Sequence, residues 1–425
     1  MTTIDGGARI ARWTPPPRPD WVARMNAAGE SLDLRTLVPL DAMSLIDTAI
    51  TATGLNDFGD DGWREAFGVL CEALENEARL NLLGRVMTRT DILLALQGRL
   101  QIEATYKRHP EIEDEEITAP LMIIGQGRSG TTALQNLLAE DPRNETMRSW
   151  EVLFPCPPPE AATYRSDPRI AQADAILQVW NESVPEVVAM HDFNGWAPTE
   201  DVHTQCMSFR MPAWIDPIWG QVPSFGQYCF GQDLSEAYRY EKRVLKLLQW
   251  RNPRERWILK SPFALTHLPV ITQVFPDVGF IWTHRDPLRA VSSMVSLVGT
   301  LNWLRTDHPH QGDTLAMLTN SDLAAGLMSQ PIGWLKDGHL RAESLCSVQY
   351  ADFVRDPLAT VGAIYEFFGI TFTAEARAAM QTFMDDHPRS GRPGHDYDVG
   401  TAEEIALERP AFADYQAYFG VPDEI

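Results

Sequence analysis

The fold of this chain is decided by one short stretch of its sequence, Leu121-Met122-Ile123-Ile124-Gly125-Gln126-Gly127-Arg128-Ser129-Gly130-Thr131-Thr132. Its first four residues are apolar without interruption, which predicts a strand buried on both faces. Two glycines, Gly125 and Gly130, then bracket a turn, and residues 133–138 continue with helical character. A strand, a glycine-rich loop and a helix in this order form a phosphate-binding loop, in which backbone N–H groups converge on an anion.

This loop differs from the one found in nucleoside triphosphatases. Their loop carries a lysine directly after the second glycine, and that lysine contacts the β- and γ-phosphates. Here Thr131 stands at the lysine position, while Arg128 lies inside the loop. The planar guanidinium of arginine pairs with two phosphate or sulfate oxygens at once. The loop therefore favours a phosphosulfate donor over Mg-ATP.

Three further apolar segments predict strands, at residues 257–259, 278–283 and 345–350. Helical patterns follow the last two of them, at residues 288–298 and 357–368. Strands that alternate with helices indicate a parallel sheet covered on both faces. We therefore expect an α/β fold, a P-loop-type parallel sheet flanked by helices.

Segments around these strands resemble, in the expected order, the family of sulfotransferases that use 3′-phosphoadenosine 5′-phosphosulfate (PAPS). The loop is similar to the 5′-phosphosulfate loop of that family, and Lys260-Ser261-Pro262 to the turn that carries its catalytic lysine. The stretch Thr283 to Ser293 resembles the 3′-phosphate motif, and residues 348–353 with Phe367-Phe368-Gly369 resemble a late strand and helix. The likeness extends from about residue 118 to 420.

The resemblance implies which residues hold PAPS. From the loop they are Arg128, Ser129, Gly130, Thr131 and Thr132, and from later segments Arg285, Ser293 and Tyr350. In the family an arginine and a serine eight residues later bind the 3′-phosphate, and these fall on Arg285 and Ser293. The segment 387–395 resembles a flexible basic loop that closes over the same phosphate, with Arg389 and Arg392 as its candidate contacts.

The chemistry of sulfuryl transfer needs a cation near the leaving oxygen and a base for the proton of the acceptor. The resemblance places the catalytic lysine at Lys260, with Arg128 sharing its task. The histidine that acts as base in the cytosolic branch is replaced by Pro262. In the tyrosylprotein and carbohydrate branches the base is a glutamate after the loop helix, which corresponds to Glu151.

A polar cluster in the middle of the chain provides alternatives for the base or for contacts to the acceptor. Its members are His191, Asp192, Glu200, Asp201 and His203. The spacing of Asp201 and His203 is also compatible with a metal site, but no further ligand stands at a recognisable spacing, so we expect none.

The sequence divides into two parts. Residues 1–115 comprise an irregular, proline-rich arm, over about the first 35 residues, and a helical region at about 41–109, which resembles that of a bacterial branch of the family. Residues 116–425 form the sulfotransferase-like P-loop α/β domain. Within it, residues 156–231 form a helical or irregular insertion that covers the active site, and its tryptophans line an apolar pocket or belong to the core. The acidic run 111–116 predicts a solvated linker.

The composition limits the partners of the protein. Lysine and arginine total 36 against 58 aspartates and glutamates, and a formal charge of -22 disfavours nucleic acid and anionic lipid. The five cysteines are far apart and never in a CxxC pair, which favours a reducing compartment. The sequence lacks a signal-peptide pattern and a membrane span, so we expect a cytoplasmic protein. A homo-oligomer is compatible with the sequence.

These observations predict an enzyme that transfers a sulfuryl group from PAPS to a hydroxyl or amine of a small or lipid-like acceptor and releases adenosine 3′,5′-bisphosphate. A nucleotide-dependent kinase is an alternative, against which the missing loop lysine counts. A non-catalytic nucleotide-binding module is the other alternative.

Overall fold

The computed structural model describes residues 12–191, 193–253, 255–309, 320–388 and 397–425. Its centre is a five-stranded parallel sheet with the strand order β2-β3-β1-β4-β5. The strands are β1 Leu121–Gly125, β2 Asn144–Glu145, β3 Arg256–Lys260, β4 Gly279–His284 and β5 Leu345–Gln349. The predicted α/β fold is thus confirmed. Strand β2 was not predicted, because two residues are too short to show a pattern.

The register of the sheet brings the carboxyl ends of β1, β3 and β4 to one edge. Ile123 of β1 lies opposite Lys260 of β3, and Gly125 lies opposite Thr283 of β4. The loop after β1 therefore begins at the same edge at which β3 and β4 end. In open parallel sheets, ligands bind outside these carboxyl ends.

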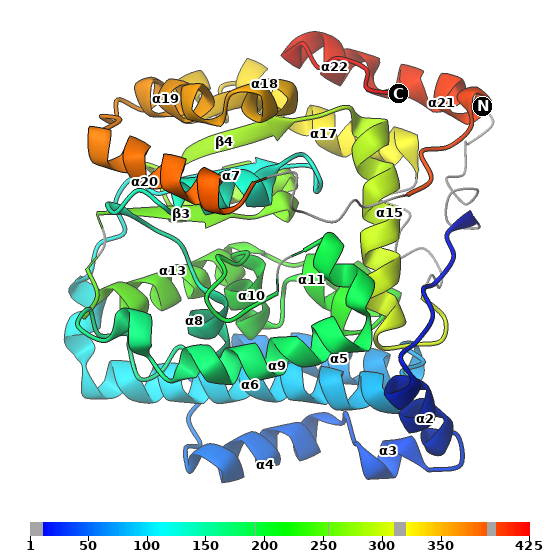
Figure 1. Cartoon of the computed structure of the whole chain (residues 1–425). Coiled ribbons are helices and arrows are strands. Elements are labelled where there is room, and N and C mark those ends of the chain that lie inside the picture. Colours follow the sequence, from blue (N-terminus) through cyan, green and yellow to red (C-terminus); the bar gives the residue numbers. More distant parts are fainter. Residues whose placement is uncertain (1–11, 192, 254, 310–319, 389–396) are drawn as a thin grey trace.

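Alternate residues of the strands belong to two hydrophobic cores, one on each face of the sheet. Leu121, Ile123 and Ile281 pack against one layer of helices, and Met122, Ile124 and Trp282 against the other. The first layer contains α7 Thr131–Leu138, α18 Tyr350–Arg355, α19 Pro357–Phe367 and α20 Ala374–Asp386. The second contains α13 Ser235–Gln249, α14 Leu268–Val274 and, farther from the sheet, α6 Leu82–Arg108 (Figure 1). The strands are thus buried on both faces, as their continuous apolar sequence predicts.

Helices form the N-terminal region, as predicted. They are α4 Ala42–Thr53, α5 Arg64–Asn76 and α6, which ends before Pro110. Helix α15, Pro287–Trp303, extends from the sheet toward α6 (Figure 1). At their contact, a Cβ added to Gly84 would lie 1.9 Å from the carbonyl oxygen of Arg305. The close approach of these two backbones requires glycine at position 84.

One local prediction is wrong, and another holds only in part. Within the arm, Asp20–Gly29 forms helix α2, because Val22 packs into the core and Asn26 accepts a hydrogen bond from the N–H of Leu83. A short helix α3, Leu34–Leu37, follows. The acidic run begins in a 3-10 turn, η2 Pro110–Asp114, although most of its acidic side chains are exposed, as a solvated linker predicts. Its residue Ile112 is buried, and Lys246 of α13 donates to the carbonyl of Glu113.

The predicted insertion consists mainly of short helices. They are η3 Tyr164–Ser166, the longer α9 Arg169–Ser183, η4 Pro185–Ala189, α10 Val202–Gln205, η5 Cys206–Ser208, α11 Pro212–Trp214, η6 Ile215–Trp219 and α12 Pro223–Phe230, preceded by α8 Ser149–Leu153. Trp180, Trp214 and Trp219 are buried members of the main core. The core interpretation of these tryptophans therefore holds.

The remaining α-helices of the described residues include α17 Ser321–Lys336, α21 Ala402–Glu408 and α22 Ala413–Phe419. The main core joins residues from both sides of position 115, among them Phe67 and Trp257. The division into two parts at that position stays a prediction. Over the described ranges, no helix has the length and apolar composition needed to cross a bilayer.

Candidate functional site

The phosphate-binding loop is held by contacts with strand β4 and with Tyr350. The hydroxyl of Ser129 donates to the carbonyl of Gln126 over 2.6 Å and lies 2.7 Å from the hydroxyl of Thr283. Gly130 has a φ of 94°, and a Cβ there would lie 2.9 Å from the ring of Tyr350. The first N–H groups of the following helix α7 have no partners within the helix, so the fixed loop offers them to an anion.

Four residues predicted to bind the donor meet at this loop. The Nε of Arg128 donates to the hydroxyl of Ser293 on α15 over 2.9 Å. The Nη1 of Arg285, just after β4, donates to the carbonyl oxygen of Arg128 over 3.0 Å. The guanidinium carbon of Arg285 also lies 4.3 Å from the ring centroid of Tyr350. The structure thus concentrates two positive charges at one edge of a strongly acidic chain, where they can hold a multiply charged anion.

Arg285 already has an acidic partner in this structure. Its Nε lies 3.0 and 3.1 Å from the two carboxylate oxygens of Glu424, and its Nη2 lies 2.9 Å from one of them. Burial by itself would lower the pKa of Arg285, but the hydrogen bonds to Glu424, together with the charges of Glu424 and neighbouring tyrosines, raise the pKa overall. Sequence reasoning missed Glu424, because its local sequence carries no motif.

Lys260 lies at the end of β3, directly beside the loop. Its side chain is buried, and its ammonium group donates to a carboxylate oxygen of Glu200 and, over 3.1 Å, to the hydroxyl of Thr132. Burial alone would raise the pKa of Glu200, but the charge and hydrogen bond of Lys260, together with His191 and His203, hold the pKa below its usual value. Glu200 is therefore a carboxylate at neutral pH, paired with a cation that also contacts the loop.

Two histidines of the predicted polar cluster surround this ion pair. Burial, together with the charge of Lys260, lowers the pKa of His191 to about 4, and it does the same for His203. Both rings are therefore neutral at physiological pH. His191 stacks on Phe193 at 4.4 Å between ring centroids, and His203 packs edge-on against Trp214 at 4.6 Å. These contacts fix the rings beside Lys260 and Glu200.

The structure places the other candidates for the base differently. A carboxylate oxygen of Glu151 accepts a hydrogen bond of 2.9 Å from the backbone N–H of Arg148, at the start of α8. This is the position of a residue that caps a helix. Asp201 is buried, and its backbone N–H donates to the carbonyl of Lys260 over 3.0 Å. Burial raises the pKa of Asp201 to about 7.

Three of the predicted site residues, Asp192, Arg389 and Arg392, lie outside the described residues. Their roles stay predictions. Among the residues that the structure describes, no three histidine, cysteine, aspartate or glutamate side chains are grouped so that they could hold a metal ion.

A cavity of about 340 Å³ adjoins the site. It lies between residues 12–16, helix α15 and the end of η4, and Trp13, Met190, Val295 and Tyr397 are among its lining residues. Met190 connects it to the site, because its carbonyl accepts a hydrogen bond of 2.7 Å from Nη1 of Arg128. The next residue, His191, belongs to the group around Lys260. The cavity thus offers partly apolar space beside the charged centre.

Known proteins resemble this chain in sequence and fold. A family model described as "Sulfotransferase family" matches residues 120–374. The crystal structure of sulfotransferase STF1 from Mycobacterium tuberculosis H37Rv has a TM-score of 0.74 and 28% sequence identity, covering 88% of this chain and 98% of that chain. For sulfotransferase STF9 from Mycobacterium avium the TM-score is 0.77 and the identity 27%, over 90% of this chain and 98% of the other.

A curated relative is also similar in sequence. It is the omega-hydroxy-beta-dihydromenaquinone-9 sulfotransferase Stf3 of Mycobacterium bovis, which is 23% identical over 285 residues. The aligned part covers 63% of this chain and 67% of that protein.

Proposed function

This chain belongs to the sulfotransferase family, and we propose that it transfers a sulfuryl group from PAPS to a hydroxyl group of a lipid-like acceptor. The observation that carries the proposal is the contact of one buried lysine, Lys260, with both the phosphate-binding loop, at Thr132, and a carboxylate, Glu200. A cation and a base are the two groups that sulfuryl transfer requires, and here they lie side by side.

The residues at the sheet edge fit the donor. Anion-binding N–H groups at the start of α7 suit the 5′-phosphosulfate, and Arg285 with Ser293 suits the 3′-phosphate. The side chain of Arg128 donates a hydrogen bond to Ser293, and its backbone carbonyl accepts one from Arg285. Arg128 therefore links the two anion sites. A nucleoside triphosphate fits less well, because Thr131 stands where the lysine for the β- and γ-phosphates is needed.

The proposed transfer breaks the bond between sulfur and the bridging oxygen of the donor and forms a bond between sulfur and the acceptor oxygen. Lys260 stabilises the negative charge that develops on the bridging oxygen. Glu200 takes the proton of the acceptor hydroxyl. The products are a sulfate ester and adenosine 3′,5′-bisphosphate.

We propose Glu200 rather than Glu151 as the base. Glu200 contacts Lys260 and is held as a carboxylate by it, whereas an oxygen of Glu151 accepts a backbone hydrogen bond in the first turn of α8. The neutral rings of His191 and His203 frame the place of the acceptor hydroxyl beside Glu200. In this position they bind and orient the acceptor without adding charge.

The nature of the acceptor is proposed from the cavity and from one relative. The printed name of that relative describes a hydroxylated menaquinone derivative as its acceptor. In this chain, the cavity at Met190 is lined by Trp13, Val295 and Tyr397 as well as by several polar and charged side chains, so it offers a partly apolar space next to the charged centre. An apolar molecule that ends in a hydroxyl group fits this arrangement. We also propose a reducing, cytoplasmic location, since all five cysteines are free thiols.

Calorimetry of the purified protein tests the donor. Adenosine 3′,5′-bisphosphate should bind with micromolar affinity and at least about tenfold more tightly than AMP, because only the former carries a 3′-phosphate. Preference for Mg-ATP would instead support a kinase. Transfer of labelled sulfate from PAPS to a panel of hydroxylated lipids then distinguishes an enzyme from a binding module.

A further inference from the structure

The carboxylate of Glu424 forms an ion pair with the guanidinium of Arg285. Three short contacts of 2.9 to 3.1 Å join the Nε and Nη2 edge of Arg285 to the two oxygens of Glu424. The remaining nitrogen, Nη1, donates to the carbonyl of Arg128, and one face of the guanidinium lies over Tyr350. The Nε and Nη2 edge of Arg285, which could form two hydrogen bonds to a bound anion, is therefore already paired with Glu424 of the same chain.

We propose that Glu424 is an internal anion that occupies the 3′-phosphate site of the free enzyme and must be displaced for the donor to bind. This inference rests on the proposed function, in which Arg285 binds the 3′-phosphate. A carboxylate and a phosphate both offer two oxygens at the spacing of the guanidinium fork, so they compete for the same edge. Glu424 thereby sets the affinity of the enzyme for every nucleotide that carries a 3′-phosphate.

The backbone near Glu424 is held independently of this contact. Asp286, the neighbour of Arg285, accepts a hydrogen bond of 2.7 Å from the N–H of Glu424 and pairs with both terminal nitrogens of Arg409. Glu424 can therefore leave Arg285 by rotation of its side chain while its backbone stays in place.

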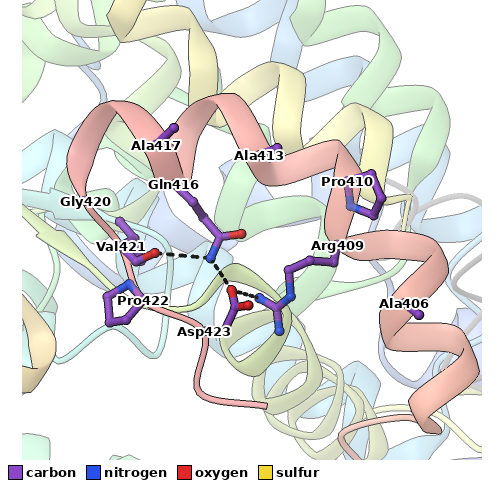
Figure 2. A pocket seen from close by; sticks show the side chains of 10 residues that line it. All are labelled: Ala406, Arg409, Pro410, Ala413, Gln416, Ala417, Gly420, Val421, Pro422 and Asp423. Carbon is purple, nitrogen blue, oxygen red and sulfur yellow. Dashed lines mark hydrogen bonds and ion pairs between the residues drawn. The ribbon is translucent and has the colours of Figure 1, made fainter.

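The preceding residues are anchored as well. Gln416 of α22 donates to Asp423 over 2.8 Å and to the carbonyl of Val421 over 3.3 Å, and Arg409 contacts Asp423 at 3.1 Å (Figure 2). These residues line a surface cavity of about 540 Å³ (Figure 2). Asp423 thus points its charge at Arg409, and Glu424 points its charge at Arg285. The two adjacent carboxylates provide a matched pair for an experiment.

The test compares the affinities of wild type, E424Q, E424A and D423N for adenosine 3′,5′-bisphosphate and for AMP by calorimetry. Removing the charge at position 424 should tighten binding of the bisphosphate about fivefold to tenfold, because the phosphate no longer competes with a carboxylate. Binding of AMP, which lacks the 3′-phosphate, should change less than about twofold. D423N should leave both affinities at the wild-type values.

Each outcome is decisive. Equal or weaker binding of the bisphosphate to both Glu424 variants would overturn the inference while leaving the proposed function intact. The same gain for AMP would also overturn it, since the effect would not depend on the 3′-phosphate. If the bisphosphate binds none of the four proteins, the proposed function itself is wrong and the inference is wrong with it. Circular dichroism of both Glu424 variants excludes misfolding, and the alanine variant checks that the added amide of glutamine has no effect of its own.

Discussion

The ammonium group of Lys260 and the carboxylate of Glu200 form an ion pair at the end of strand β3, with the lysine side chain almost completely shielded from solvent. An ion pair in such surroundings is strong only while both members are present, because removal of one leaves the other as a buried, uncompensated charge. The same ammonium contacts Thr132 of the phosphate-binding loop. Lys260 therefore connects the proposed base with the proposed donor site.

Replacement of this lysine should separate catalysis from donor binding. K260A should lower the rate of sulfuryl transfer by about 10²- to 10³-fold, since the developing charge on the leaving oxygen loses its cation. The affinity for adenosine 3′,5′-bisphosphate should change by less than about threefold, because Arg285 and the loop remain. Rates and calorimetry measure the two effects. K336A, which removes an exposed lysine from α17, is the control and should leave both quantities unchanged. Full activity of K260A would contradict the mechanism.

Two glutamates can be distinguished by paired variants. E200Q should reduce the rate by about 10²- to 10⁴-fold, as expected for loss of a general base. It should also lower the thermal stability, because Lys260 is left as a buried charge without its partner. E151A should retain most of the activity but lose about 0.5 to 1.5 kcal/mol of stability, because it removes the side chain that accepts a hydrogen bond from the backbone N–H of Arg148 at the start of α8. Steady-state rates and thermal melts of both variants provide the comparison. The reverse pattern would return the base to Glu151.

The buried carboxyl of Asp201 predicts a pH-dependent stability. Its pKa is raised by burial to about 7 in the folded protein and is about 3.9 in an unfolded chain. The folded state thus binds a proton that the unfolded state has lost, so this group lowers the stability progressively as the pH rises from about 4 to 7. D201N removes the ionisation.

Thermal melts over a range of pH test this prediction. The melting temperature of D201N should exceed that of wild type at pH 8, and the difference should shrink toward pH 5. The exposed Asp414 is the matched control, and D414N should show the same difference from wild type at every pH. A constant offset for D201N would mean that Asp201 is already ionised throughout.

Two helical glycines should respond in opposite directions to alanine. G84A places a Cβ 1.9 Å from the backbone oxygen of Arg305, which cannot move as a side chain can, and should cost about 3 kcal/mol or more. G68A adds a Cβ to an exposed position of α5 with nothing within 4 Å, and should stabilise the protein by about 0.5 to 1 kcal/mol. Urea unfolding of both variants measures the changes. Equal stabilities would refute the contact between α6 and the end of α15.

Much of the fold could be predicted because it depends on local patterns. Each strand of five or six residues coincides with an apolar run in the sequence. Polar motifs follow these strands, and the register brings the motifs to one edge of the sheet. Lys260, Arg285 and Arg128 were singled out by the resemblance to the family, and their position at or just after the end of a strand explains why the structure brings them together. Helix α2 was missed, because the prolines beside it suggested an irregular arm, and only contacts with distant residues such as Leu83 reveal its buried side.

The pairing of side chains across the site could not be predicted in the same way. Glu200 lies in a region without periodicity, and nothing in its neighbourhood indicates that it meets Lys260. For Glu151 a signal was available, since a glutamate three residues after the start of a helix is typical of a cap. Glu424 reaches Arg285 only through the packing of α22 and Arg409 against the sheet edge, so its role depends entirely on tertiary structure.

The strand order has a further consequence for how the protein is made. Strand β1 lies at the centre of the sheet, yet its residue Leu121 pairs with Ile258 and Gly279, which are synthesised much later. A nascent chain therefore carries an apolar strand with two open edges while the ribosome completes its neighbours. Such edges pair readily with other chains, and contacts between distant parts of a sequence form slowly. We expect the newly made protein to depend on chaperones, and its refolding yield to fall steeply as the protein concentration rises.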